Sequence, residues 1–326
     1  MRAVIQNSVG GPEVLVIADR PAPSPNAGEV LIRVGASGIN PVDGAVRAGR
    51  YPLLGEPPFI LGWDVSGTVE ALGSGVTGLK VGDAVFGMPR FPKQAAAYAE
   101  LAAVPADEIA PKPKGIDHLH AAALPLAGLT AWQGLVRHGG LEQGQRVLIH
   151  AAAGGVGHLA VQIAKARGAY VVATASPEKL DFARSLGADE VIDYTKDDFV
   201  DKAHDIDLVL EMFGGDHAQR SLKVLKAGGV LVSLLDVSHH KGRSQGARYP
   251  RRADVRRARP RRPCRTWQAY RSEKACRPCG KGLSARRSRR CPCLSRHQAD
   301  RQGGADGLKQ RKPFRQNKKG ADYRAF

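Results

Sequence analysis

Hydrophobic and polar positions change their period along this 326-residue chain close to residue 146. Before that point, short apolar or alternating runs are separated by turns rich in Gly, Pro and Asn. Such runs predict β-strands, because alternation directs one face of a strand toward a core. The expected strands are residues 2–5, 14–17, 29–34, 64–72, 84–88 and 97–101. Helical stretches at 117–123 and 125–138 follow them.

From residue 146 onward, β and α patterns alternate. The expected strands are residues 147–149, 170–174, 190–192, 207–210 and 229–235. The expected helices are residues 155–167, 177–186, 199–202 and 217–225. Repeated β-α units with nearly continuous apolar strands predict a doubly wound parallel sheet.

A glycine-rich turn lies at the start of this second half. The strand 147–149 leads into Ala152, Gly154, Gly155, Val156 and Gly157, and a helix follows. This matches the G-x-G-x-x-G fingerprint with Ala152 at its first position, a unit that places a phosphate on a helix N-terminus. Taken alone, the turn fits a purely structural role equally well. The surrounding β-α repeat favours a dinucleotide site.

Charge divides the chain differently. Residues 239–326 hold 28 Lys and Arg against 5 Asp and Glu, whereas the remaining residues hold 21 against 26. All five cysteines also lie in the basic segment, and its few large apolar residues predict disorder. A cysteine-free body is compatible with a reducing cytoplasm. The absence of any run of about 18 apolar residues argues against a membrane span.

Three interpretations of the basic segment stay open. It is a nucleic-acid-binding arm, a zinc knuckle built from Cys276, Cys279, Cys291 and Cys293, or the product of a shifted reading frame in the coding sequence. We favour the third, because the codons for residues 264–276 can be chosen so that another frame encodes an amphipathic helix. On that interpretation we expect weak folding or lost activity for the chain as written.

Ordered motifs in residues 1–238 resemble a known family, the zinc-independent quinone oxidoreductases of the medium-chain dehydrogenase/reductase superfamily. The motifs are Gly38-Ile-Asn-Pro-Val-Asp43, Gly62-Trp-Asp-Val-Ser-Gly67, Val81-Gly-Asp-Ala-Val-Phe86, Leu129-Thr-Ala-Trp132, Ala151-Ala-Ala-Gly-Gly-Val-Gly157 and Gly228-Gly-Val-Leu-Val232. The resemblance implies an α/β chain with a GroES-like, mostly β catalytic domain (1–124), a Rossmann cofactor domain (125–238) and a cleft between them. It also implies closing strands that residues 239–326 do not provide.

The same resemblance bears on metal chemistry. Zinc alcohol dehydrogenases of the superfamily carry a Cys where Asn40 stands and a His where Trp63 stands. An amide and an indole do not supply the thiolate and imidazole that a catalytic Zn²⁺ requires. No metal site is therefore expected. The remaining chemistry is hydride transfer to an acceptor that conjugation has already made electrophilic.

Cofactor choice follows from the end of the second predicted strand. Enzymes that select NAD usually carry an Asp or Glu there, and this strand ends at Ser176 without one. Ser176, Lys179 and Tyr194 supply a hydroxyl, an ammonium and a phenol, which suit a 2′-phosphate, and family members that use NADPH hold it with matching residues. We therefore expect NADPH. A solvated Lys179 and a Ser176 that only caps a helix are the alternatives.

The resemblance also implies residues at the reacting end. Asn40 and Asp43 lie on a loop that resembles the nicotinamide-side wall, and Thr130, near the start of a helix, resembles a cofactor contact. Tyr51 matches a tyrosine that faces the acceptor and can bond a carbonyl oxygen as charge builds there. Two alternatives stay open. Tyr51 packs beside Pro52, or Asp43 is an Asx residue that stabilises a turn.

These observations lead to one functional expectation and one rival. We expect an NADPH-dependent, zinc-free reductase of a quinone or α,β-unsaturated carbonyl, cytoplasmic and without a membrane partner, with a homodimer as its possible assembly. The rival is a non-catalytic protein, either a decayed dehydrogenase or one that binds nucleic acid through residues 239–326.

Overall fold

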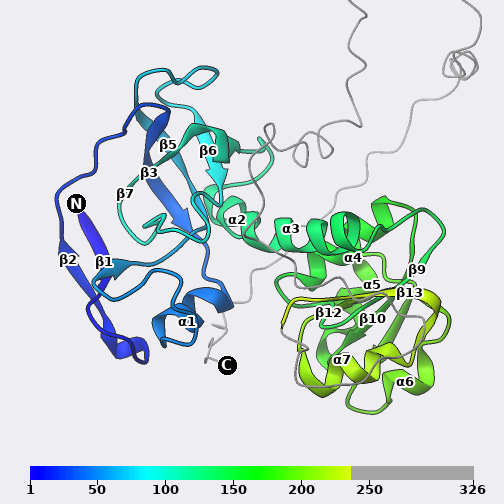
Figure 1. Cartoon of the computed structure of the whole chain (residues 1–326). Helices are drawn as coiled ribbons and strands as arrows, with labels where there is room; N and C mark the ends of the chain where they lie inside the picture. Colours follow the sequence, from blue (N-terminus) through cyan, green and yellow to red (C-terminus); the bar gives the residue numbers. More distant parts are fainter. Residues whose placement is uncertain (236–326) are drawn as a thin grey trace, which may run out of the picture. The chain divides into compact units, whose positions relative to one another are not determined.

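The computed structural model describes residues 1–235, and its first half contains two antiparallel sheets (Figure 1). The smaller has the strand order β2-β1-β4, and the larger has the order β7-β3-β5-β6-β8. The strands are β1 (Arg2–Gln6), β2 (Leu15–Asp19), β3 (Glu29–Ser37), β4 (Phe59–Ile60), β5 (Val65–Leu72), β6 (Ala84–Gly87), β7 (Leu101–Pro105) and β8 (Ile109–Pro111). The predicted mostly β character of this half is confirmed.

Alternation along β3 builds the core of the larger sheet. Val30 and Ile32 are fully buried, whereas Arg33 is exposed. The two apolar side chains pack with Val65 and Val85 of the neighbouring strands. Burying each such side chain stabilises the fold by roughly 1.5–3 kcal/mol. For this reason, alternating apolar and polar residues predict a strand with one buried face.

Two predictions in this half were wrong in detail. The strand expected at 97–101 forms four residues later, as β7, because Tyr98 packs against Gly62 and Ala96 has a left-handed backbone (φ 56°). The loop expected around Asn40 and Asp43 contains a helix, α1 (Pro41–Arg47). A proline at its first position and a capping box start this helix.

The second half forms a five-stranded parallel sheet of order β11-β10-β9-β12-β13. Its strands are β9 (Arg146–Ile149), β10 (Tyr170–Ala175), β11 (Glu190–Asp193), β12 (Ile206–Glu211) and β13 (Leu225–Ser233). The first strand in sequence lies in the middle, so the strand order reverses at β9. In open parallel sheets, ligands bind beyond the carboxyl ends of strands at such a switch point.

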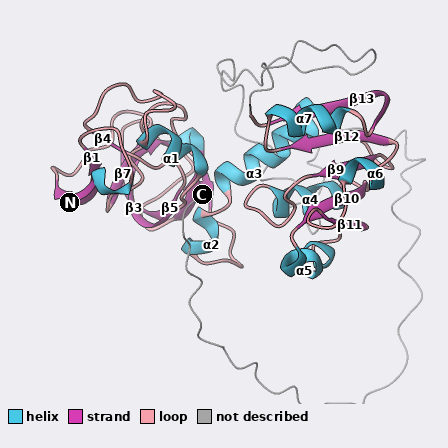
Figure 2. Cartoon of the chain, turned by 90° about the horizontal axis from the view of Figure 1, so that it is seen from below, coloured by secondary structure: helices cyan, strands magenta, loops and turns pink. Residues whose placement is uncertain are grey.

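Helices cover both faces of this sheet. The helices of the described residues, besides α1, are α2 (His118–Ala122), α3 (Pro125–Trp132), α4 (Gly157–Ala166), α5 (Leu180–Ser185), α6 (Phe199–Lys202) and α7 (Gly215–Leu222), with a π-helical turn at Gln133–His138. One core joins α3, α4 and α5 to the sheet, and another joins α6 and α7 to its opposite face. Figure 2 shows α7 beside β12 and β13, and α5 near the β11 edge. The predicted doubly wound sheet is confirmed.

Residues 236–326 lie outside the described part of the chain. The predictions made for the basic segment, including its disorder and the possible zinc knuckle, therefore concern residues outside the description. Among residues 1–235, no helix is both long and apolar enough to cross a membrane.

Candidate active site

The glycine-rich turn joins β9 to α4 at the switch point of the parallel sheet. Gly154 and Gly155 are exposed, whereas Ala152 and Gly157 are buried. The first N–H groups of a helix have no partner within it, so the start of α4 presents donors to an anion. Nearby backbone bonds, from Ala152 N to Thr174 O (3.0 Å) and from Gly154 N to Ala151 O (2.8 Å), fix the shape of the turn.

Gly157 is the residue that this turn requires to be glycine. A Cβ at Gly157 would lie 2.1 Å from the carbonyl oxygen of Ala151 and 2.7 Å from the Cα of Ala152. A Cβ at Gly155 would meet nothing within 4 Å. The last glycine of the fingerprint therefore serves close packing of α4 on β9. The space at Gly155 stays open for the backbone to approach a ligand.

The alanine in the first fingerprint position has a structural explanation. The left-handed backbone of this turn falls on Ala151, with φ of 47°, and not on Ala152. Ala152 needs no positive φ, so the methyl group is tolerated in the core beneath the turn.

The residues expected to bind the 2′-phosphate come together beside β10 and β11. These strands pair in parallel, with Ala175 opposite Asp193, so Ser176 and Tyr194 leave the sheet side by side. Lys179 ends the 3₁₀ turn Pro177–Lys179 and is exposed. Tyr194 is 57% exposed. A hydroxyl, an ammonium and a phenol therefore follow the carboxyl ends of these two neighbouring strands.

Glu178 was missed by the sequence argument. Its Oε1 accepts a hydrogen bond from the Ser176 hydroxyl at 2.6 Å. This bond and the charge of Lys179 hold the pKa of Glu178 below its usual value. The strand itself ends without an acid, but a carboxylate stands two residues beyond Ser176. The signal was present in the sequence as the residue between Pro177 and Lys179.

On the catalytic side, Asn40 and Asp43 form the capping box of α1. Asn40 N donates to Asp43 Oδ2 at 2.7 Å, and the Asn40 side chain faces the backbone of Asp43. Asp43 is only 3% exposed. Burial raises the pKa of its carboxyl, against hydrogen bonds from Asn40, Tyr98 and Gly62. The alternative of a locally bonded Asp43 is therefore correct in part, with the carboxylate capping a helix instead of a turn.

Asp64 joins this cluster from the end of the segment before β5 and was also missed. Its Oδ2 accepts from Asn40 Nδ2 at 2.9 Å, and its Oδ1 accepts from Leu126 N at 2.8 Å. The side chain is 1% exposed, and burial raises its pKa to about 7. The available signal was an acid placed between Trp63 and Val65 in an otherwise apolar run.

Tyr51 and Thr130, the other residues predicted at the reacting end, are not part of the hydrogen-bonded cluster of Asn40, Asp43 and Asp64. Tyr51 follows α1, is 46% exposed, and its hydroxyl makes no hydrogen bond within residues 1–235. Thr130 lies in the last turn of α3 and not near its start, and its hydroxyl donates to Leu126 O at 2.7 Å. The Thr130 oxygen can still accept a hydrogen bond. No hydrogen bond joins either residue to Asn40 within the described part of the chain.

Trp63 is a core residue. It is 1% exposed, packs edge-on to Phe91, and donates its indole N–H to Lys93 O at 2.7 Å. Within residues 1–235, no group of three or more His, Cys, Asp or Glu side chains is arranged to hold a metal ion.

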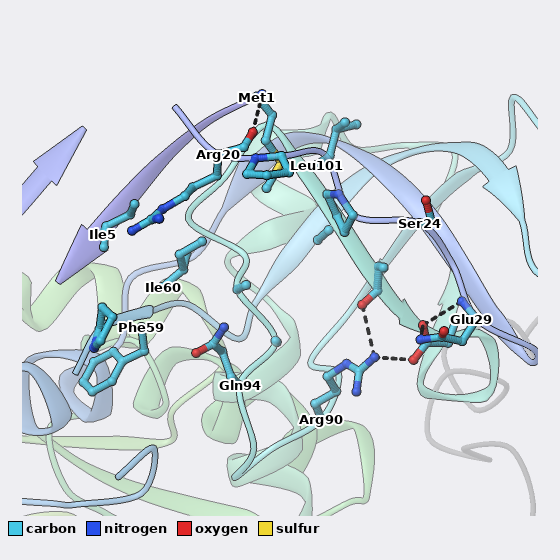
Figure 3. A pocket seen from close by; sticks show the side chains of 18 residues that line it. Met1, Ile5, Arg20, Ser24, Glu29, Phe59, Ile60, Arg90, Gln94 and Leu101 are labelled. Carbon is cyan, nitrogen blue, oxygen red and sulfur yellow. Dashed lines mark hydrogen bonds and ion pairs between the residues drawn. The ribbon is translucent and has the colours of Figure 1, made fainter. Parts of the chain in front are cut away.

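A cavity of about 600 Å³ lies elsewhere in the first half, against β1, β3, β4 and β7 (Figure 3). Its apolar wall includes Ile5, Ile60 and Leu101, and Arg90 pairs with Glu29 at its edge. None of the residues predicted to act on cofactor or acceptor lines it. The cavity is therefore separate from the candidate site.

Comparison with known proteins identifies the two halves. Residues 26–114 match the alcohol dehydrogenase GroES-like domain, and residues 155–234 match the model described as zinc-binding dehydrogenase. Rat quinone oxidoreductase is 36% identical over 240 residues, which cover 71% of this chain and 72% of the relative. The chain belongs to the quinone oxidoreductase family of the medium-chain dehydrogenase/reductase superfamily.

Other relatives agree with membership of the quinone oxidoreductase family. The chloroplastic NADPH-dependent alkenal/one oxidoreductase of Arabidopsis thaliana is 42% identical over 72% of this chain, which spans 62% of that relative's length. The quinone oxidoreductase structure from Coxiella burnetii has a TM-score of 0.68 at 40% identity, covering 72% of this chain and 75% of that one. The NADPH complex of Escherichia coli quinone oxidoreductase has a TM-score of 0.66 at 34% identity, covering 72% of each chain.

Proposed function

We propose that this protein transfers a hydride from NADPH to a quinone or an α,β-unsaturated carbonyl without zinc. One observation carries the proposal: the packed glycine-rich turn and the cluster of Ser176, Lys179 and Tyr194 lie beyond the carboxyl ends of neighbouring parallel strands. We assign residues 1–124 to the catalytic domain and residues 125–238 to the cofactor domain, in a cytoplasmic protein.

The residues present fit NADPH. The start of α4 and the exposed Gly154 and Gly155 suit a pyrophosphate, since backbone N–H groups at a helix N-terminus bind anions. Lys179 and Tyr194 suit the 2′-phosphate. NADPH, when bound, supplies the hydride from its nicotinamide ring. Relatives whose names specify NADPH, and the NADPH-bound Escherichia coli structure, support this choice.

The acceptor side is assigned to Asn40, Asp43 and Tyr51. The Tyr51 hydroxyl, which makes no hydrogen bond within residues 1–235, is suited to donate to the acceptor oxygen, where negative charge develops as the hydride arrives. The backbone N–H of Asn40 donates to Asp43 and its side-chain amide donates to Asp64, so the bond to Asp64 sets the orientation that the amide offers a ligand. Trp63 and Asn40 supply no thiolate or imidazole, which leaves polarisation of the acceptor to its own conjugation.

The test is NADPH oxidation by the purified 326-residue chain with a benzoquinone and with a simple enone. Saturable rates with both substrates, unchanged after incubation with a strong chelator, would support the proposal and would contradict the lost activity expected if residues 239–326 come from a shifted reading frame. Chelator-sensitive oxidation of an alcohol would overturn the zinc-free assignment. A folded protein that leaves NADPH unoxidised, and binds DNA only while residues 239–326 are present, would support a binding protein instead.

A further inference from the structure

Asp64 is a buried acid that the proposed reaction does not use directly. At 1% exposure it cannot touch an acceptor or a nucleotide, yet it is among the least favourable groups to bury in a protein interior. Buried carboxyls in such places are retained for a structural or a functional reason. The contacts of Asp64 distinguish between these two.

The first contact connects Asp64 to a residue of the proposed site. Asp64 Oδ2 accepts one N–H of the Asn40 amide at 2.9 Å. An amide NH₂ has two donors, so this bond leaves one N–H of Asn40 for a ligand. An ionised carboxylate can only accept, and it therefore dictates that the nitrogen of Asn40, and not its oxygen, faces Asp64.

The second contact fixes Asp64 itself. Its Oδ1 accepts from the backbone N–H of Leu126, in the first turn of α3, at 2.8 Å. The carboxylate thus connects the segment before α1 with α3. Charge-assisted bonds of this kind are about twice as strong as neutral ones.

The backbone around Asp64 is shaped for this approach. A Cβ on Gly38 would lie 2.9 Å from Asp64 Oδ2 and 2.6 Å from Ala122 O, so only glycine lets the Asn40 segment come this close. The Ser37 hydroxyl also donates to Asp64 O at 2.7 Å. Packing and hydrogen bonds therefore both act to place Asn40 against Asp64.

We propose that Asp64 is a positioning residue that holds the Asn40 amide in the orientation needed for hydride transfer. The inference rests on the proposed function. It adds that the acceptor side is organised by an acid that contacts neither substrate. Protonation of Asp64 weakens its hold on Asn40, because a neutral carboxyl is a poorer acceptor than a carboxylate.

Ionisation of Asp64 should therefore be visible in the pH profile. Burial raises the pKa of Asp64 to about 7, and the nearby charge of Asp43 acts in the same direction. The titratable groups that face it are Asp43 from α1 and Tyr98, whose own pKa is raised by burial and by both carboxylates. We expect kcat to fall as the pH drops through about 7, and this inflection to vanish in Asp64→Asn.

The decisive experiment is a double-mutant cycle on kcat with the full chain. Asp64→Asn should lower kcat about tenfold in the wild-type background, as expected for a small misplacement of a catalytic group. In an Asn40→Ala background the same change should cost less than about twofold, because Asp64 then has nothing to position. KM for NADPH should change little, since the nucleotide is held mainly at its phosphates.

A matched control is Glu211→Gln, which removes another carboxylate with 0% exposure, far along the sequence in β12. Glu211 bonds the amides of Phe213 and Gly214, and its loss should leave the inflection near neutral pH in place. If Asp64→Asn lowers kcat by the same factor in the wild-type and Asn40→Ala backgrounds, the positioning role is overturned. It is also overturned if the pH inflection persists in Asp64→Asn. Either result leaves the proposed function standing. A folded wild-type chain that does not oxidise NADPH would overturn the proposed function.

Discussion

The hydroxyl of Ser176 donates to the carboxylate of Glu178 at 2.6 Å, at the edge of the sheet assigned to the cofactor's 2′-phosphate. A phosphate monoester carries about two negative charges near neutral pH, so a carboxylate at this edge opposes it. Lys179 is next to Glu178 and acts in the opposite direction. On the proposed assignment, the preference for NADPH over NADH is set by the balance between these two adjacent charges.

Neutralising Glu178 should sharpen the preference for NADPH. We expect Glu178→Gln to raise the ratio of kcat/KM for NADPH over NADH about threefold, and Lys179→Met to lower it about tenfold, through Coulomb interaction at an exposed site. Steady-state kinetics with both nucleotides provide the measurement. Lys202→Met, which removes an exposed lysine paired with Asp197, is the control and should leave the ratio unchanged. The ratio of kcat/KM for NADPH over NADH must rise in Glu178→Gln and fall in Lys179→Met. If the ratio shifts in the same direction in both variants, the charge-balance explanation is contradicted.

Alanine at two glycines of the turn should separate packing from cofactor contact. Gly157→Ala forces a Cβ to within 2.1 Å of Ala151 O and should lower the free energy of unfolding by about 1–3 kcal/mol, the usual cost of overpacking. Gly155→Ala meets no protein atom within 4 Å and should leave stability unchanged while weakening NADPH binding about tenfold. Urea unfolding and fluorescence titration measure the two quantities. Equal effects of the variants on stability would contradict the packing argument.

The cofactor half was predictable because its signals are local in sequence. The turn occupies residues 152–157, and the strand that precedes it and the helix that follows it carry clear hydrophobic periods. The acceptor side is assembled from distant segments: Asp64 lies 24 residues from Asn40 and 62 from Leu126. Periodicity carries no information about such pairs. The helix α1 was missed because its seven residues include a proline and a glycine.

Stability should depend on pH through Asp64. The pKa of this group rises from 3.8 to about 7 on folding, so between these values the folded protein keeps a proton that the unfolded chain releases. Unfolding free energy should therefore fall as the pH rises from about 4 to 7, by an Asp64 contribution of up to about 4 kcal/mol. Urea unfolding at several pH values measures this slope, and Asp64→Asn should flatten it.

Glu211 should change the unfolding free energy with pH in the opposite direction to Asp64. Burial alone would raise its pKa, but hydrogen bonds from His217, Phe213, Gly214 and Ser233 outweigh burial and lower it. Its contribution is present above the unfolded pKa of a glutamate and is lost as the pH falls through the lower folded value. Glu211→Gln should therefore flatten the curve of unfolding free energy against pH only on its acid side. A wild-type slope between pH 5 and 7 that survives in Asp64→Asn would show that another group titrates there.

Tyr51 should affect turnover without affecting the fold. Its side chain is 46% exposed and its hydroxyl bonds nothing within residues 1–235, so Tyr51→Phe should change the free energy of unfolding by less than about 0.5 kcal/mol. If the hydroxyl donates to the acceptor oxygen as charge develops, kcat should fall at least about tenfold, with a smaller effect on KM for NADPH. Tyr170→Phe is the control, because that hydroxyl bonds Glu190 at 2.8 Å, and it should leave kcat unchanged. An unchanged kcat in Tyr51→Phe would favour the packing role beside Pro52 and leave the acceptor oxygen to Asn40.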